Sequence, residues 1–236
     1  MAHRVNLPRS RGVDNLQLPL RSSIKRRLKE NMKNVAILLA FAFVIAGGFL
    51  IAGAATSARA VEGEIPNPPA IGATIEDFTL PDATGQERAL KSLAGKKGTV
   101  LLFIAVQCPV SNAYNERMEK LAQDYKAKGI AVIGINSNVK EDADAVRGHA
   151  AENKLTFPIL KDPGNKIADK LGAMVTPEAY FLDASNKLLY HGRIDNSRNG
   201  DNIETTDLRN ALDAALAGKA IEKTEAKAFG CTIKRA

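Results

Sequence analysis

One cysteine of this sequence stands where thiol chemistry is commonly placed, between an apolar strand pattern and a helical pattern. Cys108 follows the apolar run 98–106 (GTVLLFIAV), and Pro109 comes directly after it. The N-terminal end of a helix offers free backbone N–H groups and a partial positive charge, which favour a thiolate over a thiol. Such a setting lowers a cysteine pKa from about 8.5 to about 3.5–7.5. The sequence therefore predicts a reactive thiol, against the alternative of a small buried cysteine that only packs.

Two neighbours of Cys108 are expected to support it. Pro109 has no N–H to lose and suits the first turn of a helix. Ser111 stands three residues after the cysteine, where many thiol enzymes carry a second cysteine, and its hydroxyl is expected to donate a hydrogen bond to the sulfur. A disulfide within a Cys-x-x-Cys motif is therefore excluded, and Cys231 is the only other cysteine of the chain.

The elements that must position Cys108 begin near Gly72, where short apolar segments alternate with helical patterns. Strands are expected over 77–80, 87–93, 98–106, 130–136, 178–183 and 187–194, and the first two of them form a hairpin. Helices are expected over 111–128, 141–154, 166–172 and 205–218. This order predicts an α/β sandwich with a mixed central sheet flanked by helices.

The N-terminal part of the chain has the pattern of an export segment. Residues 1–34 form a basic leader, residues 35–56 an apolar segment long enough to cross a bilayer, and residues 57–71 a proline-rich linker. The basic residues precede the apolar segment, so its N-terminal side is expected in the cytoplasm and the domain outside it. A transmembrane helix and a signal peptide cleaved near Ala60 both remain open, and Met32 is an alternative start to Met1. Both interpretations place the domain outside the cytoplasm. An uncleaved helix would anchor it to the membrane of the cell envelope, whereas cleavage near Ala60 would make it periplasmic or secreted.

The distribution of charge argues against a nucleic-acid partner. The chain has a formal net charge of +7, but ten Lys/Arg and only two Asp/Glu lie in residues 1–60. The rest of the chain is nearly neutral, and no basic patch is interleaved with aromatic residues. Two cysteines without paired Cys/His ligand spacing predict no metal site, and no cofactor is expected.

Several segments in order resemble the thioredoxin superfamily, in its peroxiredoxin-like (redoxin, AhpC/TSA-type) branch. They are FTLPDATG at 78–85, VLLFIAVQCP at 100–109, KDPGNKIADKLGAMVTPEAYFLD at 161–183 and LLYHGRID at 188–195. The resemblance implies a thioredoxin-like sandwich over 72–218, preceded by the N-terminal hydrophobic helix and followed by a tail, 219–236. It also implies that Thr176 and Pro177 form the cis-proline loop that faces the active cysteine and, with Pro109, shape the substrate groove.

The chain departs from the family pattern at several positions of the site. Thioredoxins carry Cys-x-x-Cys, whereas this chain has a CxxS site ending at Ser111, and the peroxiredoxin cysteine aligns with that same serine. Peroxiredoxins also place an arginine beside the thiolate, and Arg193 is a candidate only by its position in a strand. Cys231 lies in GCTIKR, which resembles a C-terminal element of relatives, and this implies a resolving or structural partner for Cys108. A stray cysteine on a mobile tail is the alternative, although an unpaired thiol is a liability in an oxidising compartment.

These residues predict an exported or membrane-anchored thiol–disulfide oxidoreductase that acts through Cys108, with Cys231 as its possible resolving partner. The expected partners are a protein with thiols or a disulfide or a small-molecule hydroperoxide, an external thiol reductant, and the membrane through residues 35–56 if they are uncleaved. Two alternatives remain open. One is a thiol peroxidase with an atypical cysteine register, and the other is a non-enzymatic binding module that carries a structural disulfide.

Overall fold

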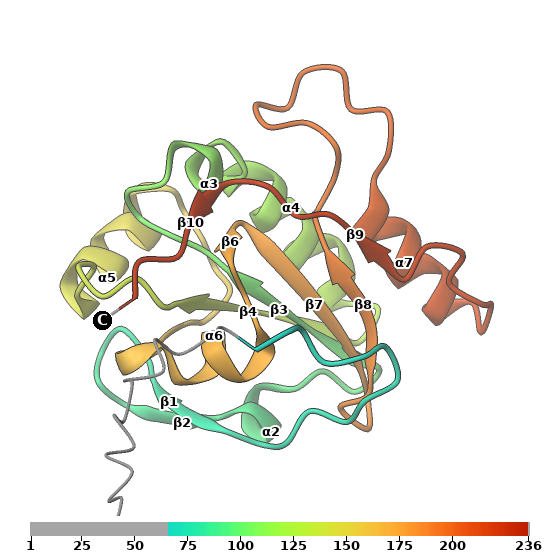
Figure 1. The fold of residues 1–236 in the computed structure, drawn as a ribbon, viewed down its shortest axis with the longest axis horizontal. Helices are drawn as coiled ribbons and strands as arrows, with labels where there is room; N and C mark the ends of the chain where they lie inside the picture. The colour runs from blue at the N-terminus through green and yellow to red at the C-terminus, as the bar shows by residue number, and fades with distance from the viewer. Residues whose placement is uncertain (1–65, 236) are drawn as a thin grey trace, which may run out of the picture. The chain divides into compact units, whose positions relative to one another are not determined.

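A mixed sheet of six strands forms the centre of the computed structural model, which describes residues 66–235 (Figure 1). The strands lie in the order β5 (Ile159–Lys161), β4 (Ile130–Asn136), β3 (Gly98–Phe103), β7 (Glu178–Asp183), β8 (Leu188–Gly192) and β9 (Glu225–Ala226). The central strand β3 pairs parallel with β4 and antiparallel with β7. Every residue of β3 is buried, because both faces of the sheet are covered, and this explains its continuous apolar sequence.

Alternate residues of the central strands enter two separate cores. Val100 and Leu102 pack with α4 (Asn115–Lys126), α5 (Ala143–Glu152) and α7 (Asp207–Leu216). Leu101 and Phe103 pack on the opposite face. That face is covered by the hairpin β1 (Thr79–Pro81) and β2 (Glu87–Ala89), α2 (Leu90–Leu93) and α6 (Lys166–Leu171), which follows the short 3₁₀ turn η1 (Pro163–Asn165). The predicted α/β sandwich with a mixed sheet flanked by helices is confirmed.

Some of the expected elements are interrupted. The helix expected over 111–128 consists of α3 (Pro109–Ala113) and α4, which are separated at Tyr114. The Tyr114 ring is buried, and its hydroxyl lies 2.7 Å from Oδ1 of Asp195. The strand expected over 98–106 ends at Phe103, and residues 90–93 of the expected second hairpin strand form α2.

The C-terminal residues return to the domain instead of leaving it. After β9 the chain crosses above the sheet beside α3 and forms β10 (Cys231–Thr232), drawn in red in Figure 1. β10 pairs antiparallel with β6 (Val175–Thr176), and Cys231 is the partner of Thr176 in this register. Residues far apart in sequence thus meet next to the start of α3.

The predicted leader, the predicted apolar segment 35–56 and residues 57–65 of the linker lie outside the described residues. In residues 66–235, no helix has both the length and the apolarity needed to cross a bilayer.

Candidate active site

Cys108 is the N-cap residue of α3, and Pro109 is the first helical residue, as expected. The main-chain N–H of Ser111 donates a hydrogen bond to Cys108 Sγ at 3.2 Å. On its other side Sγ lies 3.3 Å from the carbonyl oxygen of Thr176, to which the thiol donates. The side chain is only 3% exposed. The sulfur is therefore held at a strand-to-helix junction between two fixed backbone groups.

The Thr176–Pro177 peptide bond is cis, as the resemblance to the thioredoxin superfamily implies. The carbonyl oxygen of Thr176 faces Cys108, and Thr176 is also the residue that pairs with Cys231 of β10. Gly230 precedes Cys231, and a Cβ atom at this position would lie 1.9 Å from the Thr176 carbonyl oxygen. Glycine is therefore required for β10 to approach the loop closely enough to bring Cys231 beside Cys108.

The two thiols shift each other's pKa in opposite directions. Burial disfavours the charged form of Cys108, but hydrogen bonds from the Cys231 side chain and from the main-chain N–H groups of Ser111 and Cys231 outweigh it. The buried Thr176 hydroxyl, which has no other hydrogen-bond partner within residues 66–235, also favours the Cys108 thiolate. As a result the pKa of Cys108 is lowered, while burial and the neighbouring Cys108 raise the pKa of Cys231.

Replacing Cys231 with alanine should raise the pKa of Cys108, because the largest interaction that stabilises its thiolate is lost. The measurement is the rate of alkylation of Cys108 as a function of pH, followed by mass spectrometry of its peptide. Cys231→Ser is the matched control, because the serine hydroxyl still donates a hydrogen bond to the thiolate. Identical pH profiles for the wild type and Cys231→Ala would contradict the proposed interaction.

Ser111 contributes to the site through its backbone. Its hydroxyl accepts a hydrogen bond from the N–H of Ala105 at 3.1 Å, and within residues 66–235 it forms no bond to the sulfur. The expectation that this hydroxyl bonds to Cys108 is therefore wrong. The helical turn directs the main-chain N–H of Ser111 to the sulfur, while the side chain holds the end of the preceding strand.

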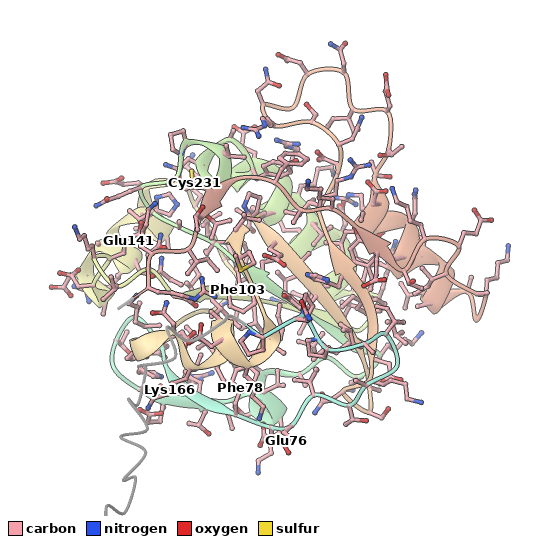
Figure 2. The ribbon with its side chains drawn as sticks, in the orientation of Figure 1. Glu76, Phe78, Phe103, Glu141, Lys166 and Cys231 are labelled. Atoms are coloured by element: carbon pink, nitrogen blue, oxygen red, sulfur yellow. The ribbon has the colours of Figure 1, made fainter. Side chains whose placement is uncertain are left out.

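A buried carboxylate that no pattern of the sequence indicates fixes the loop before Cys108. Glu141 is 2% exposed and accepts hydrogen bonds from the N–H groups of Val106 and Gln107, both at 2.9 Å. Asn136 at the end of β4 donates a third bond to the same carboxylate. Figure 2 shows Glu141 and Cys231 on the same side of the molecule. The helix pattern over 141–154 gives no sign of this role, which only the tertiary contacts of Glu141 reveal.

A second buried carboxylate accepts hydrogen bonds from the backbone of the cis-proline loop. Glu178 accepts hydrogen bonds from the N–H groups of Met174 and Val175, at 2.8 and 3.0 Å. His191 on β8 lies 2.6 Å from its other oxygen and stacks on the Tyr180 ring. Although burial opposes ionisation, the bonds from His191 and the backbone lower the pKa of Glu178. This carboxylate therefore fixes the loop that carries Thr176.

The structure does not place Arg193 at the thiolate. Its guanidinium forms an ion pair with the buried carboxylate of Asp207 at 2.7 Å and is also near the hydroxyl of Thr205. None of the groups that shift the pKa of Cys108 is Arg193. Position in a strand was the only basis for proposing it as the thiolate's partner, and its charge is instead used to hold the start of α7.

Asp207 should make stability depend on acid pH. Burial opposes its ionisation, but hydrogen bonds from Arg193 and Lys223 lower the pKa of Asp207 to about 2. Because this pKa is lower when folded than unfolded, the contribution is present above about pH 4 and is lost as pH falls towards 2. In urea unfolding from pH 7 to 2, Asp207→Asn should remove about 2 kcal/mol of this pH-dependent stability. Parallel stability curves for wild type and variant would contradict it.

Both cysteines line one cavity, with a volume of about 530 Å³. Its other lining residues come from the loop before α3, the loop before α5 and the C-terminal segment, and they include Gln107, Val139, Lys140, Glu141, Lys234 and Arg235. Within residues 66–235 there is no cluster of His, Cys, Asp and Glu that can hold a metal ion. The chemistry that this arrangement supports is therefore exchange between a stabilised thiolate, a neighbouring thiol and a molecule entering the cavity.

Comparison with known proteins finds similarity both to a thiol-disulfide oxidoreductase and to a peroxiredoxin. A crystal structure of a hypothetical protein from Sinorhizobium meliloti 1021 is 34% identical and covers 72% of this chain and 97% of its own, with a TM-score of 0.67. Thiol-disulfide oxidoreductase ResA of Halalkalibacterium halodurans is 30% identical over 113 residues, which are 48% of this chain and 62% of that protein. The match thus spans less than two thirds of that relative's length. Chloroplastic peroxiredoxin Q of Sedum lineare is 29% identical over 154 residues, 60% of this chain and 78% of that protein.

The family model described as the AhpC/TSA family matches residues 71–191. This match covers just over half of the chain and includes Cys108 and the Thr176–Pro177 loop. The chain therefore belongs to the AhpC/TSA family and has a thioredoxin-like fold.

Proposed function

We propose that this protein is a thiol–disulfide oxidoreductase whose working pair is Cys108 and Cys231. The observation that carries the proposal is the pairing of β10 with β6, which places Cys231 within hydrogen-bonding reach of the Cys108 sulfur. The lowered pKa of Cys108 and raised pKa of Cys231 give one thiol the role of nucleophile and the other that of proton-bearing partner. Similarity to a thiol-disulfide oxidoreductase agrees with this assignment.

The reaction proceeds in two exchange steps. The Cys108 thiolate attacks one sulfur of a partner disulfide, forms a mixed disulfide and releases the other partner sulfur as a thiolate. Cys231 then loses its proton to solvent and attacks Cys108 Sγ, which forms the Cys108–Cys231 bond and releases the second partner thiolate. Two electrons pass from the cysteine pair to the partner. An external thiol must return them for the next cycle.

We also propose that the domain acts outside the cytoplasm, on partners of the cell envelope. This rests on the sequence of the N-terminal region, where an uncharged segment long enough to span a bilayer follows a basic leader. Partners of this kind are proteins with thiols or a disulfide. The fractionation of the full-length chain between membrane and soluble fractions, with the mass of its N-terminal peptide, distinguishes an anchor from a cleaved signal.

The function is tested by the turnover of a protein disulfide such as that of insulin, with dithiothreitol as electron source and full-length protein as catalyst. We expect turnover above the uncatalysed rate and a Cys108–Cys231 bond in the protein after the thiol is removed. Failure of both would overturn the proposal. The non-enzymatic alternative predicts the bond without any turnover, so the two readouts separate these functions.

A thiol peroxidase is the second candidate, and similarity to peroxiredoxin Q is the observation that favours it. In this reaction the Cys108 thiolate attacks a hydroperoxide oxygen, which gives a sulfenic acid and an alkoxide. Cys231 condenses with the sulfenic acid to form the disulfide and water. The absence of Arg193 from the thiolate's surroundings weighs against it. Rapid consumption of cumene hydroperoxide, faster than turnover of the protein disulfide, would favour the peroxidase.

A further inference from the structure

Cys231 lies on a short strand whose neighbouring residues are held to the domain by hydrogen bonds and an ion pair. Immediately after β10, the N–H of Ile233 bonds to the carbonyl of Met174 at 2.9 Å, and the Ile233 side chain is buried. Arg235 then forms an ion pair with Asp169 at 2.8 Å. Before β10, the strand β9 is paired with β8. The segment is therefore fastened on both sides of Cys231, which lies next to Thr176 at the β6 edge.

The two sulfurs of that bond differ in how they are approached. Thiol–disulfide exchange proceeds with the entering sulfur in line with the bond that breaks, so the attack comes from the side opposite the leaving sulfur. For Cys108, the groups around Sγ include the Ser111 N–H at 3.2 Å and the Thr176 carbonyl at 3.3 Å, in a site that is 3% exposed. Cys231 is partly exposed, although both cysteines line the 530 Å³ cavity. An entering thiol therefore reaches the partly exposed Cys231 more readily than the buried Cys108.

Cys108 and Cys231 also differ as leaving groups, and this difference again favours attack at Cys231. When Cys231 is attacked, Cys108 leaves as a thiolate into the hydrogen bonds that already lower its pKa. When Cys108 is attacked, Cys231 leaves as a thiolate whose pKa is raised by burial and by its neighbour. Because a thiol of lower pKa leaves faster, the reaction that releases Cys108 is favoured, and this is attack at Cys231.

We infer that the external thiol that reduces the oxidised protein attacks Cys231, and that this entry site favours an anionic thiol. This rests on the proposed function. The entering thiolate forms a bond to Cys231 Sγ, the Cys108–Cys231 bond breaks, and its electron pair leaves with Cys108. A second external thiolate then attacks the entering sulfur of the mixed disulfide. Cys231 leaves and takes a proton from solvent, and the external pair is oxidised to a disulfide.

The preference for an anionic thiol comes from two lysines of the cavity. Lys140 and Lys234 line it beside Cys231, and both are exposed. Neither forms an ion pair within residues 66–235. Of the other charged residues that line the cavity, Arg235 is paired with Asp169, and the buried Glu141 carboxylate accepts hydrogen bonds from the backbone. The free charge at the entrance is therefore positive and attracts an entering thiol that carries carboxylates.

The attacked sulfur is identified by adding glutathione to the oxidised full-length protein, quenching with acid at short times and mapping the adduct in tryptic peptides. We expect glutathione on AFGCTIK, residues 228–234, and not on the peptide 98–117 that contains Cys108. Cys108→Ser and Cys231→Ser loaded with glutathione provide the two reference adducts. An adduct mainly on Cys108, or equal amounts on both peptides, would overturn the inference while leaving the proposed function intact. Absence of the disulfide before glutathione is added would overturn both.

The charge preference is tested by the rate of reduction with glutathione and with cationic cysteamine, each corrected for its thiolate fraction. Lys140→Gln and Lys234→Gln should each lower the glutathione-to-cysteamine rate ratio by about two- to fivefold at low salt. Lys166→Gln is the matched control, because this exposed lysine on α6 lies away from Cys231 in Figure 2. A ratio unchanged in both cavity variants would overturn the preference for an anionic thiol.

Discussion

Cys108→Ser is expected to lower disulfide turnover by about a thousand-fold or more, to the uncatalysed background. The serine hydroxyl fits the same volume and can accept the bond from the Ser111 N–H. It is not ionised near neutral pH and forms no disulfide, so both exchange steps are lost. The measurement is the steady-state reduction of insulin disulfides by the full-length variant.

The matched variant for this experiment is Cys231→Ser. It keeps the Cys108 thiolate but removes the second exchange step, so a mixed disulfide should accumulate on Cys108 and turnover should depend on external thiol for its release. Thermal unfolding of both variants is the control that tests whether they are folded. Turnover by Cys108→Ser within tenfold of the wild type would mean that the chemistry does not pass through this sulfur.

Glu178→Ala is expected to destabilise the fold by about 3–5 kcal/mol, the largest stability effect in the site. The carboxylate is 3% exposed and accepts bonds from two N–H groups, from His191 and from the Tyr180 hydroxyl. Its removal leaves the two main-chain N–H groups without their acceptor and takes one acceptor from His191 and from Tyr180, whose hydroxyl also donates to the Leu171 carbonyl. The free energy of unfolding by urea at pH 7 measures the loss, and a difference below about 1 kcal/mol would contradict this role.

The pH dependence of the same variant gives an independent check. The pKa of Glu178 is lowered in the folded protein, so its contribution is present above the unfolded pKa and is lost as pH falls through the folded value. The stability difference between wild type and Glu178→Ala should therefore shrink below about pH 4.5. Glu178→Gln keeps the shape of the side chain and should fall between them, because one of its two polar groups is a donor facing donors.

The parts of the fold that were predicted are those with a strong local pattern. The runs 130–136 and 178–183 coincide with β4 and β7, because continuous apolar sequence marks strands that are buried on both faces. The Cys108–Pro109 junction was likewise readable, since a proline at the first helical position is a local signal. The cis-proline loop came from resemblance to a family.

The parts that were missed depend on contacts between distant segments. β6 and β10 are two residues long each, too short for any periodicity, and Cys231 meets Thr176 only because the tail returns across the sheet. Glu141 and Glu178 look like ordinary surface carboxylates in sequence, yet backbone N–H groups without strand partners draw them inside. Arg193 was misplaced for the same reason, because its partner Asp207 lies on another element.

The most direct test of the account is a redox titration of the full-length protein against glutathione or dithiothreitol buffers, with mass-spectrometric mapping of the oxidised form. We predict a Cys108–Cys231 bond with a reduction potential between about −120 and −270 mV, the range of catalytic disulfides. A Cys108–Cys231 bond with a potential below about −300 mV would show a structural crosslink, and two free thiols under all oxidising buffers would show no redox pair. Either result would contradict a catalytic role for the pair.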